Sequence, residues 1–137
     1  MSKMVIGLSS GSVDKLVGTG VIMSGAAADD MDVEVYVLLT AARAFIKGNE
    51  DLTDSLVEYP HLKSEFFANM EKLAVPTWLE FFEQAKEFTD VKIYICSLAG
   101  KLWGGEKKED FIDIVDGLCG IGQYIDAAKE ADIHINI

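Results

Sequence analysis

The chain of 137 residues is 50% apolar and 26% charged, a composition typical of one globular domain with a sizeable core and not of a disordered chain. Its formal net charge of −11 and its lack of a basic cluster argue against nucleic acid as a partner, because phosphate backbones would repel it. No apolar run reaches the roughly 18 residues of a membrane-spanning helix, and the first ten residues lack the apolar core of a signal peptide. We therefore expect a cytoplasmic protein without a membrane span.

Two cysteines, Cys96 and Cys119, are too few for a disulfide framework in a chain of this length, so we expect both thiols to be reduced. The two histidines, His61 and His134, share no ligand spacing with the cysteines. The sequence therefore predicts no metal site, and we expect no cofactor.

The first part of the chain predicts a strand–helix–strand unit. Residues 4–8 form a short apolar strand, residues 13–28 carry apolar side chains at helical spacing, and residues 33–39 form a nearly continuous apolar strand. Glycines within the helix lower its intrinsic helix propensity, and we interpret them as points of close approach to a neighbouring element. Such an apolar second strand is typical of a parallel sheet covered on both faces.

The middle of the chain is expected to be helical and partly irregular. Residues 40–47 predict a short helix, and the acidic, turn-rich residues 49–60 predict a surface loop or lid. Residues 62–74 predict an amphipathic helix, whose large apolar side chains serve a core face, a subunit contact or a lid. Thr77 and Glu80 fit a capping box that opens the next helix.

The last part of the chain continues the alternation of strands and helices. The expected elements are a strand at 91–95, a helix at 97–103, a strand at 112–115, a turn at 116–120, a helix at 120–130 and a strand at 133–137. The sequence thus predicts an α/β fold: a single three-layer domain over residues 1–137, with about five mostly parallel strands and helices on both faces.

Cys96 lies where a strand gives way to a helix, beside the unpaired N–H groups of a helix start, which favour negative charge. The thiolate is the reactive form of cysteine. In open α/β sheets, functional groups gather at the carboxyl ends of the strands. We therefore predict that Cys96 is a nucleophile, the alternative being that it is a small buried residue of the core.

Other strand ends of a parallel sheet should meet near Cys96. Cys119 is a candidate second thiol, or it only fills space beside a glycine. A serine-rich turn before the first helix is a weak candidate for binding an anion, since it lacks the lysine of a P-loop and the spacing of a dinucleotide fingerprint. The turn is Ser9, Ser10, Gly11 and Ser12, and the candidate rim of the site is Thr40, Arg43, Ser97 and Leu98. For Arg43 we favour the alternative that it is a solvated helix residue.

Four stretches of the chain resemble the DsrE/DsrF family of small sulfur-handling proteins. They are KMVIGLSSGSVDKLVGTGVIMSGAAADDMDVEVYVL, TAARAFIKG, VKIYICSLAGKLWG and EDFIDIVDGLCGIGQYIDAAKEADIHI. They cover nearly all of the chain outside residues 49–76, which we interpret as a variable helical or loop insertion. No single motif is very specific, but the ordered set is.

The resemblance implies a sulfur carrier or sulfurtransferase that holds sulfane sulfur as a persulfide on Cys96 and passes it to a partner thiol. Its implied partners are sulfur donor and acceptor proteins or small sulfane-sulfur compounds. It also implies a homo-oligomer, trimeric or hexameric, or a mixed complex. Cys119 departs from the glycine or small apolar residue expected there, which leaves a two-thiol mechanism open.

Three other functions remain open on the sequence alone. One is a non-catalytic binding or assembly subunit of the same fold, with an inert Cys96. Another is a thiol redox protein that uses Cys96 and Cys119 as a pair. The third is a small-ligand binder at the turn that ends at Ser12.

Overall fold

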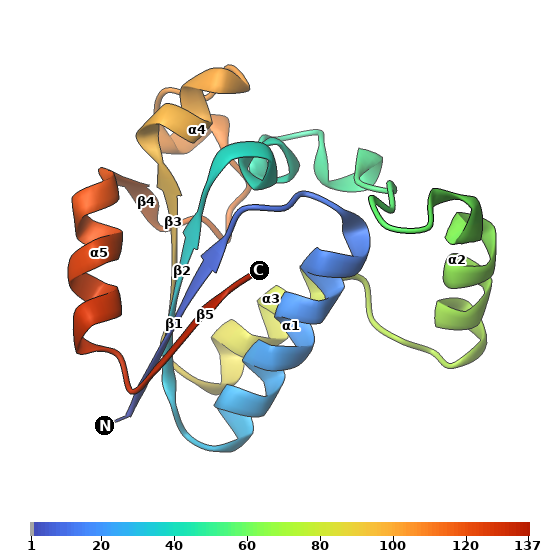
Figure 1. Ribbon diagram of the computed structural model, residues 1–137, viewed down its shortest axis with the longest axis horizontal. Helices are drawn as coiled ribbons and strands as arrows, with labels where there is room; N and C mark the ends of the chain where they lie inside the picture. Colours follow the sequence, from blue (N-terminus) through green and yellow to red (C-terminus); the bar gives the residue numbers. More distant parts are fainter. Residues whose placement is uncertain (1) are drawn as a thin grey trace.

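The five strands of the chain form one fully parallel sheet in the computed structural model, which describes residues 2–137 (Figure 1). The strands are β1 (Lys3–Leu8), β2 (Asp32–Val37), β3 (Val91–Cys96), β4 (Gly117–Cys119) and β5 (Ile133–Asn136). They are ordered β4-β3-β2-β1-β5, and each neighbouring pair is parallel. The predicted α/β fold is confirmed.

Helices cover both faces of the sheet. They are α1 (Val13–Ala28), α2 (Lys63–Lys72), α3 (Trp78–Phe88), α4 (Ser97–Leu102) and α5 (Ile121–Glu130), with short 3₁₀ helices η1 (Leu39–Phe45), η2 (Glu50–Leu52), η3 (Pro60–Leu62) and η4 (Lys108–Asp110). Helices α1 and α3 lie on one face and α5 on the other, so the predicted three layers are present (Figure 1). Within residues 2–137, no helix has the length and apolar character to cross a bilayer.

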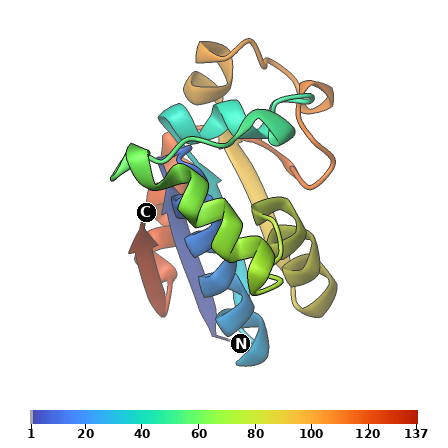
Figure 2. The ribbon, with the colours of Figure 1, turned by 90° about the vertical axis from the view of Figure 1, so that its right-hand side faces the viewer.

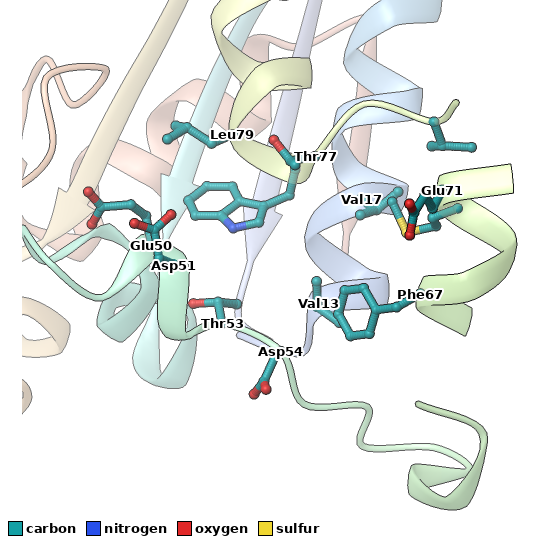
Figure 3. Close-up of a pocket in the computed structure, with 13 residues that line it drawn as sticks. Val13, Val17, Glu50, Asp51, Thr53, Asp54, Phe67, Glu71, Thr77 and Leu79 are labelled. Atoms are coloured by element: carbon teal, nitrogen blue, oxygen red, sulfur yellow. The ribbon is translucent and has the colours of Figure 1, made fainter. Parts of the chain in front are cut away.

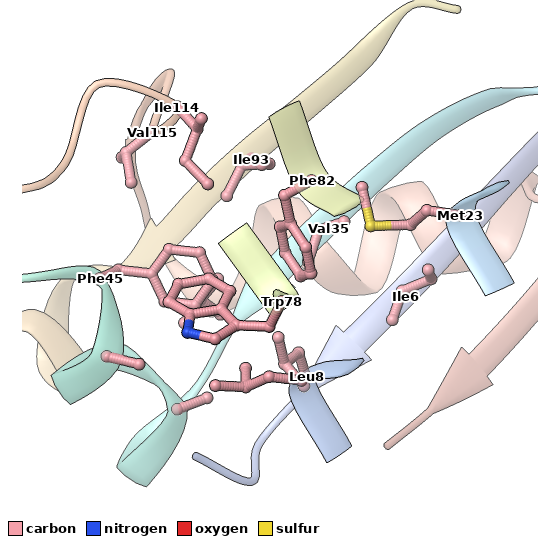
Figure 4. Close-up of a cluster of buried hydrophobic side chains, with 14 of the residues drawn as sticks. Ile6, Leu8, Met23, Val35, Phe45, Trp78, Phe82, Ile93, Ile114 and Val115 are labelled. Carbon is pink, nitrogen blue, oxygen red and sulfur yellow. The ribbon is translucent and has the colours of Figure 1, made fainter. Parts of the chain in front are cut away.

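The main hydrophobic core lies between the sheet and helices α1 and α3. Side chains from β1, β2 and β3 meet Met23 of α1 and Phe82 of α3 there (Figure 4). The ring of Phe82 is fully buried and packs against Trp78 and Phe45, with centroids 5.4 and 5.9 Å away. This aromatic cluster packs α3 and η1 against each other over the sheet.

Close packing of α1 against α3 depends on Gly20. A Cβ atom built on Gly20 would lie 2.4 Å from Cβ of Phe81, whereas one built on Gly25 of the same helix would meet nothing within 4 Å. The predicted role of the helix glycines in close approach thus applies to Gly20. At Gly25 the glycine only lowers the helix propensity.

We expect Gly20→Ala and Gly25→Ala to have opposite effects on stability. Gly20→Ala should lower the free energy of unfolding by about 1–3 kcal/mol, because the added methyl forces α1 and α3 apart. Gly25→Ala should raise it by about 0.5–1 kcal/mol through helix propensity. Urea denaturation of the two variants measures the difference. Similar effects of both substitutions would contradict the close approach.

The predicted strand at 112–115 and the predicted turn at 116–120 are wrong, because the strand is Gly117–Cys119. The side chains of Ile112, Ile114 and Val115 are buried, but their backbone runs as an irregular segment beside η1. Asp116 then sets the start of β4: its N–H donates to the Ile93 carbonyl, and its carboxylate accepts from the Ile93 N–H at 2.8 Å. A short apolar run in a buried loop has the same pattern as a strand.

The other predicted boundaries differ by a few residues. The strand expected to reach residue 39 ends at Val37, because Leu39 has a φ of 42° and cannot continue an extended strand. The short helix expected at 40–47 is the 3₁₀ helix η1. The capping box of α3 is present: Glu80 N–H donates to Thr77 Oγ1, and Thr77 N–H donates to the Glu80 carboxylate.

Helix α2 stands apart from the sheet and lies beside α1 (Figures 1 and 2). None of its side chains is fully buried, and Phe66 and Phe67 are its partly buried apolar residues that pack on the core. Leu73, directly after the helix, is 72% exposed. The large apolar side chains of this segment therefore form only a partial core face.

Candidate functional site

The carboxyl ends of β1 to β4 lie at one edge of the sheet, where α4 and η1 begin (Figure 1). This edge brings together the predicted site residues in two neighbouring groups. One group contains the thiols at the ends of β3 and β4. The other contains the serine-rich turn after β1 and the start of η1.

Cys96 is the last residue of β3 and the N-cap of α4, as predicted. It is partly exposed. Ser97, the first residue of α4, donates a hydrogen bond from its hydroxyl to the Cys119 carbonyl at 3.1 Å. Leu98 is 64% exposed. Cys96 thus combines access to solvent with a position beside the N–H groups of the first helical turn.

Cys119 is the register partner of Cys96 in the neighbouring strand. It is buried in a small cluster with Val5, Tyr36 and Tyr124, on the face of the sheet that α5 covers. Burial, together with the negative charge of Cys96, raises the pKa of the Cys119 thiol to about 11. The two thiols are therefore adjacent but unequal, since Cys119 stays protonated at neutral pH.

The folded protein should react with iodoacetamide at Cys96 first. At pH 8 a thiol with a pKa of about 11 is deprotonated in only about one molecule in a thousand, and burial restricts access as well. Alkylation of Cys119 should accelerate about tenfold per pH unit as pH rises towards 11. Peptide mass mapping over a pH series measures both rates, with denatured protein as the two-adduct control. Equal rates at both cysteines in the folded protein at pH 8 would contradict this picture.

The serine-rich turn is closed over by the loop that follows η2. Ser12 is buried, its hydroxyl is within donating distance of the Asp14 carboxylate and of the Ser55 carbonyl, and it accepts from the Val57 N–H at 3.1 Å. The Val13 N–H, at the start of α1, donates to the same Ser55 carbonyl at 2.9 Å. The predicted surface loop 49–60 thus covers this turn, and the chain itself satisfies groups that an anion would otherwise contact.

Most of the turn and part of the predicted rim line one cavity of about 240 Å³. The lining of the cavity includes Ser10, Gly11, Ser12, Thr40 and Arg43, which come from different parts of the sequence. Ser9 lies beside it, and its carbonyl accepts a hydrogen bond from the Thr40 hydroxyl at 2.9 Å. Neither cysteine lines this cavity, and neither does Ser97 or Leu98. The structure therefore separates the predicted site into a thiol group and a cavity group.

Trp103 belongs to the cavity group and is absent from the predicted site. It lines the cavity, and its indole N–H donates to the Leu39 carbonyl at 3.0 Å. It follows Cys96 by seven residues, a spacing that places two residues on the same side of a helix. That spacing is the signal that could have found it. Leu39 of η1 and Leu102 of α4 are exposed apolar side chains at the same edge of the sheet.

Among residues 2–137, no cluster of three or more histidine, cysteine or acidic side chains could hold a metal ion. His134 lies on β5, at the opposite edge of the sheet from Cys119, and its Nε2 is 2.7 Å from the Tyr124 hydroxyl. His61 lies in η3 and packs edge-on against Tyr59. Neither histidine accompanies the thiols.

Residues 38–135 match the sequence model of the DsrE/DsrF/DrsH-like family. The match covers well over half of the chain and contains Cys96 and Cys119, whereas β1, α1 and β2 lie before it. No curated protein matches the chain.

Proposed function

Because the chain belongs to the DsrE/DsrF/DrsH-like family, we propose that it is a sulfur carrier in which Cys96 accepts sulfane sulfur as a persulfide and passes it to a partner thiol. The observation that carries this proposal is the inequality of the two thiols: Cys96 is partly exposed at the end of β3, and Cys119 is buried. The proposed unit is a single domain over residues 1–137.

Sulfur uptake would proceed by attack of the Cys96 thiolate on the outer sulfur of a donor persulfide or polysulfide. A sulfur–sulfur bond forms at Cys96, the donor's own sulfur–sulfur bond breaks, and the donor leaves as a thiolate. Cys96 is then a persulfide, and no net oxidation has occurred. Cys96 is the N-cap residue of α4 and its sulfur accepts no hydrogen bond from the first turn, so it is the partial positive charge of the helix start that favours the anionic form of the product.

Sulfur release would be the same reaction in the opposite direction. An acceptor thiolate attacks the outer sulfur of the Cys96 persulfide, and Cys96 leaves as a thiolate. Exposed apolar side chains on η1 and α4 support docking of a donor, an acceptor or a second subunit at this edge: Leu39, Leu98 and Leu102 are 54, 64 and 58% exposed. A homo-oligomer or a mixed complex would cover this surface.

A second candidate function, a two-cysteine redox protein, is favoured by the register of the thiols. Cys96 and Cys119 are paired in neighbouring strands, whose spacing of about 4.8 Å lies within the Cα separations of disulfides. A peroxide would oxidise the Cys96 thiolate to a sulfenic acid and be reduced to hydroxide. The Cys119 thiol would then displace water and form the disulfide.

Intact mass spectrometry separates the two functions. Incubation with polysulfide should add the mass of one sulfur atom to the wild-type protein, and reductant should remove it. Incubation with peroxide should remove the mass of two hydrogen atoms only if Cys96 and Cys119 form a disulfide. No sulfur gain from polysulfide, with Cys96 reduced and accessible to iodoacetamide, would overturn the carrier proposal.

A further inference from the structure

A cavity of about 460 Å³ lies between α2 and the rest of the protein, and neither cysteine lines it (Figure 3). Val13 and Val17 of α1 and Phe67 of α2 form apolar walls, and Trp78 and Leu79 of α3 complete them. The volume is within the range of about 300–1,000 Å³ for small-molecule sites, which are mostly apolar with a few polar groups. The cavity can therefore hold an organic ligand with an apolar body.

The polar lining of this cavity is acidic. Glu50, Asp51 and Asp54 approach from the segment after η1, and Glu71 approaches from α2 (Figure 3). No lysine or arginine among residues 2–137 lines the cavity. Asp54 has an ion pair with Lys63 at 2.6 Å, whereas Asp51 and Glu71 have none within the described chain. These carboxylates give the cavity a negative potential that favours a cationic ligand.

Trp78 supplies a second, independent feature of the cavity. Its side chain is 96% buried, with only 4% exposed, and its ring packs edge-on against Phe45 and Phe82. Its indole N–H has no hydrogen-bond acceptor among residues 2–137. Every fully buried side-chain nitrogen or oxygen in this part of the chain has a hydrogen-bond partner, so the indole nitrogen of Trp78 is not fully buried. The N–H is therefore open to the cavity that Trp78 lines. Buried indole N–H groups normally have an acceptor, as Trp103 has in the Leu39 carbonyl.

We propose that this cavity binds an organic cation with an apolar body. The ammonium group faces the end of the cavity formed by Glu50 and Asp51, the apolar body lies against the valines of α1, and a carbonyl or ether oxygen accepts from the Trp78 N–H. A neutral amphiphile would use only part of this lining, and an anion would be repelled by it. The site is distinct from the cysteines and goes beyond sulfur transfer.

Two probes with one body and opposite charge test the proposal. N-benzoyl-1,4-diaminobutane has a phenyl ring, an amide carbonyl and an ammonium group, and 5-benzamidopentanoate replaces the ammonium with a carboxylate. The chain has two tryptophans, so Trp103→Phe leaves Trp78 as the only indole emitter. At low salt the cation should bind at least about tenfold more tightly than the anion and should shift the Trp78 emission. High salt should shrink this preference.

A matched pair of variants locates the binding. In the Trp103→Phe background, Glu50→Gln with Asp51→Asn removes two charges from the cavity, and Glu87→Gln with Glu109→Gln removes two exposed charges elsewhere. The first variant should weaken cation binding about fivefold, and the second less than about twofold. The proposal is overturned by equal affinity for both probes, by equal effects of both variants, by unchanged Trp78 emission on binding, or by no binding of the cation.

Discussion

Cys96→Ser should abolish the gain of one sulfur atom from polysulfide, whereas Cys119→Ser should retain the full gain. The serine hydroxyl at position 96 keeps the size and the N-cap position of the side chain but cannot form a persulfide. Cys119 is buried and stays protonated because its pKa is raised to about 11, so it contributes no nucleophile at neutral pH. Intact mass of the wild type and of the two variants, before and after reductant, measures the effect.

Each alternative result has a separate meaning. Loss of the gain in both variants would indicate a relay of sulfur between the two thiols and would contradict a role for Cys96 alone. Retention of the gain in Cys96→Ser would assign the persulfide to Cys119 and would contradict the proposed nucleophile. Circular dichroism of both variants is the control, because misfolding would expose Cys119 in Cys96→Ser and would change the surroundings of Cys96 in Cys119→Ser.

Phe82→Ala should lower the free energy of unfolding by about 3–5 kcal/mol, a large part of the roughly 5–15 kcal/mol that stabilises a typical domain. The Phe82 side chain is fully buried between α3 and the sheet, and its removal leaves a cavity beside Trp78 and Phe45. Guanidinium denaturation followed by circular dichroism measures the loss.

Phe88→Ala is the matched control, since it is the same substitution at the last residue of the same helix. Phe88 is 75% exposed, so its removal leaves no cavity. We expect a change within about 0.5 kcal/mol. Similar losses for Phe82→Ala and Phe88→Ala would show that the core does not depend on the aromatic cluster around Phe82.

The strands and helices with a strong hydrophobic periodicity were predictable from the sequence, and the elements with a weak periodicity were not. Residues 91–95 alternate between buried and more exposed side chains and include β-branched residues, as strands do. Thr77 and Glu80 correctly marked the start of α3. The apolar residues at 112–115 suggested a strand, but a side-chain contact decides the boundary: the Asp116 carboxylate binds the Ile93 N–H from 23 positions away. A contact this distant in sequence leaves no local pattern.

The candidate site was predictable at the strand ends and not in the cavities. The position of Cys96 between a predicted strand and a predicted helix marked it as a candidate. The pairing of the parallel strands β3 and β4 placed Cys119 beside it. Coverage of Ser12 by Ser55 and Val57 depends on how a long loop folds back, which composition does not determine. Similarly, Trp78 reads in sequence as one of several core aromatics, and only the structure shows its N–H open to a cavity.

The weak attachment of α2 has a consequence for the population of binding-competent molecules. Because this helix buries no side chain completely, we expect its release from the body to require less free energy than global unfolding. A ligand held between α2 and α1 binds only the closed form, so the apparent affinity is the intrinsic affinity multiplied by the closed fraction. Substitutions on the far side of α2 can therefore tune binding without touching the ligand.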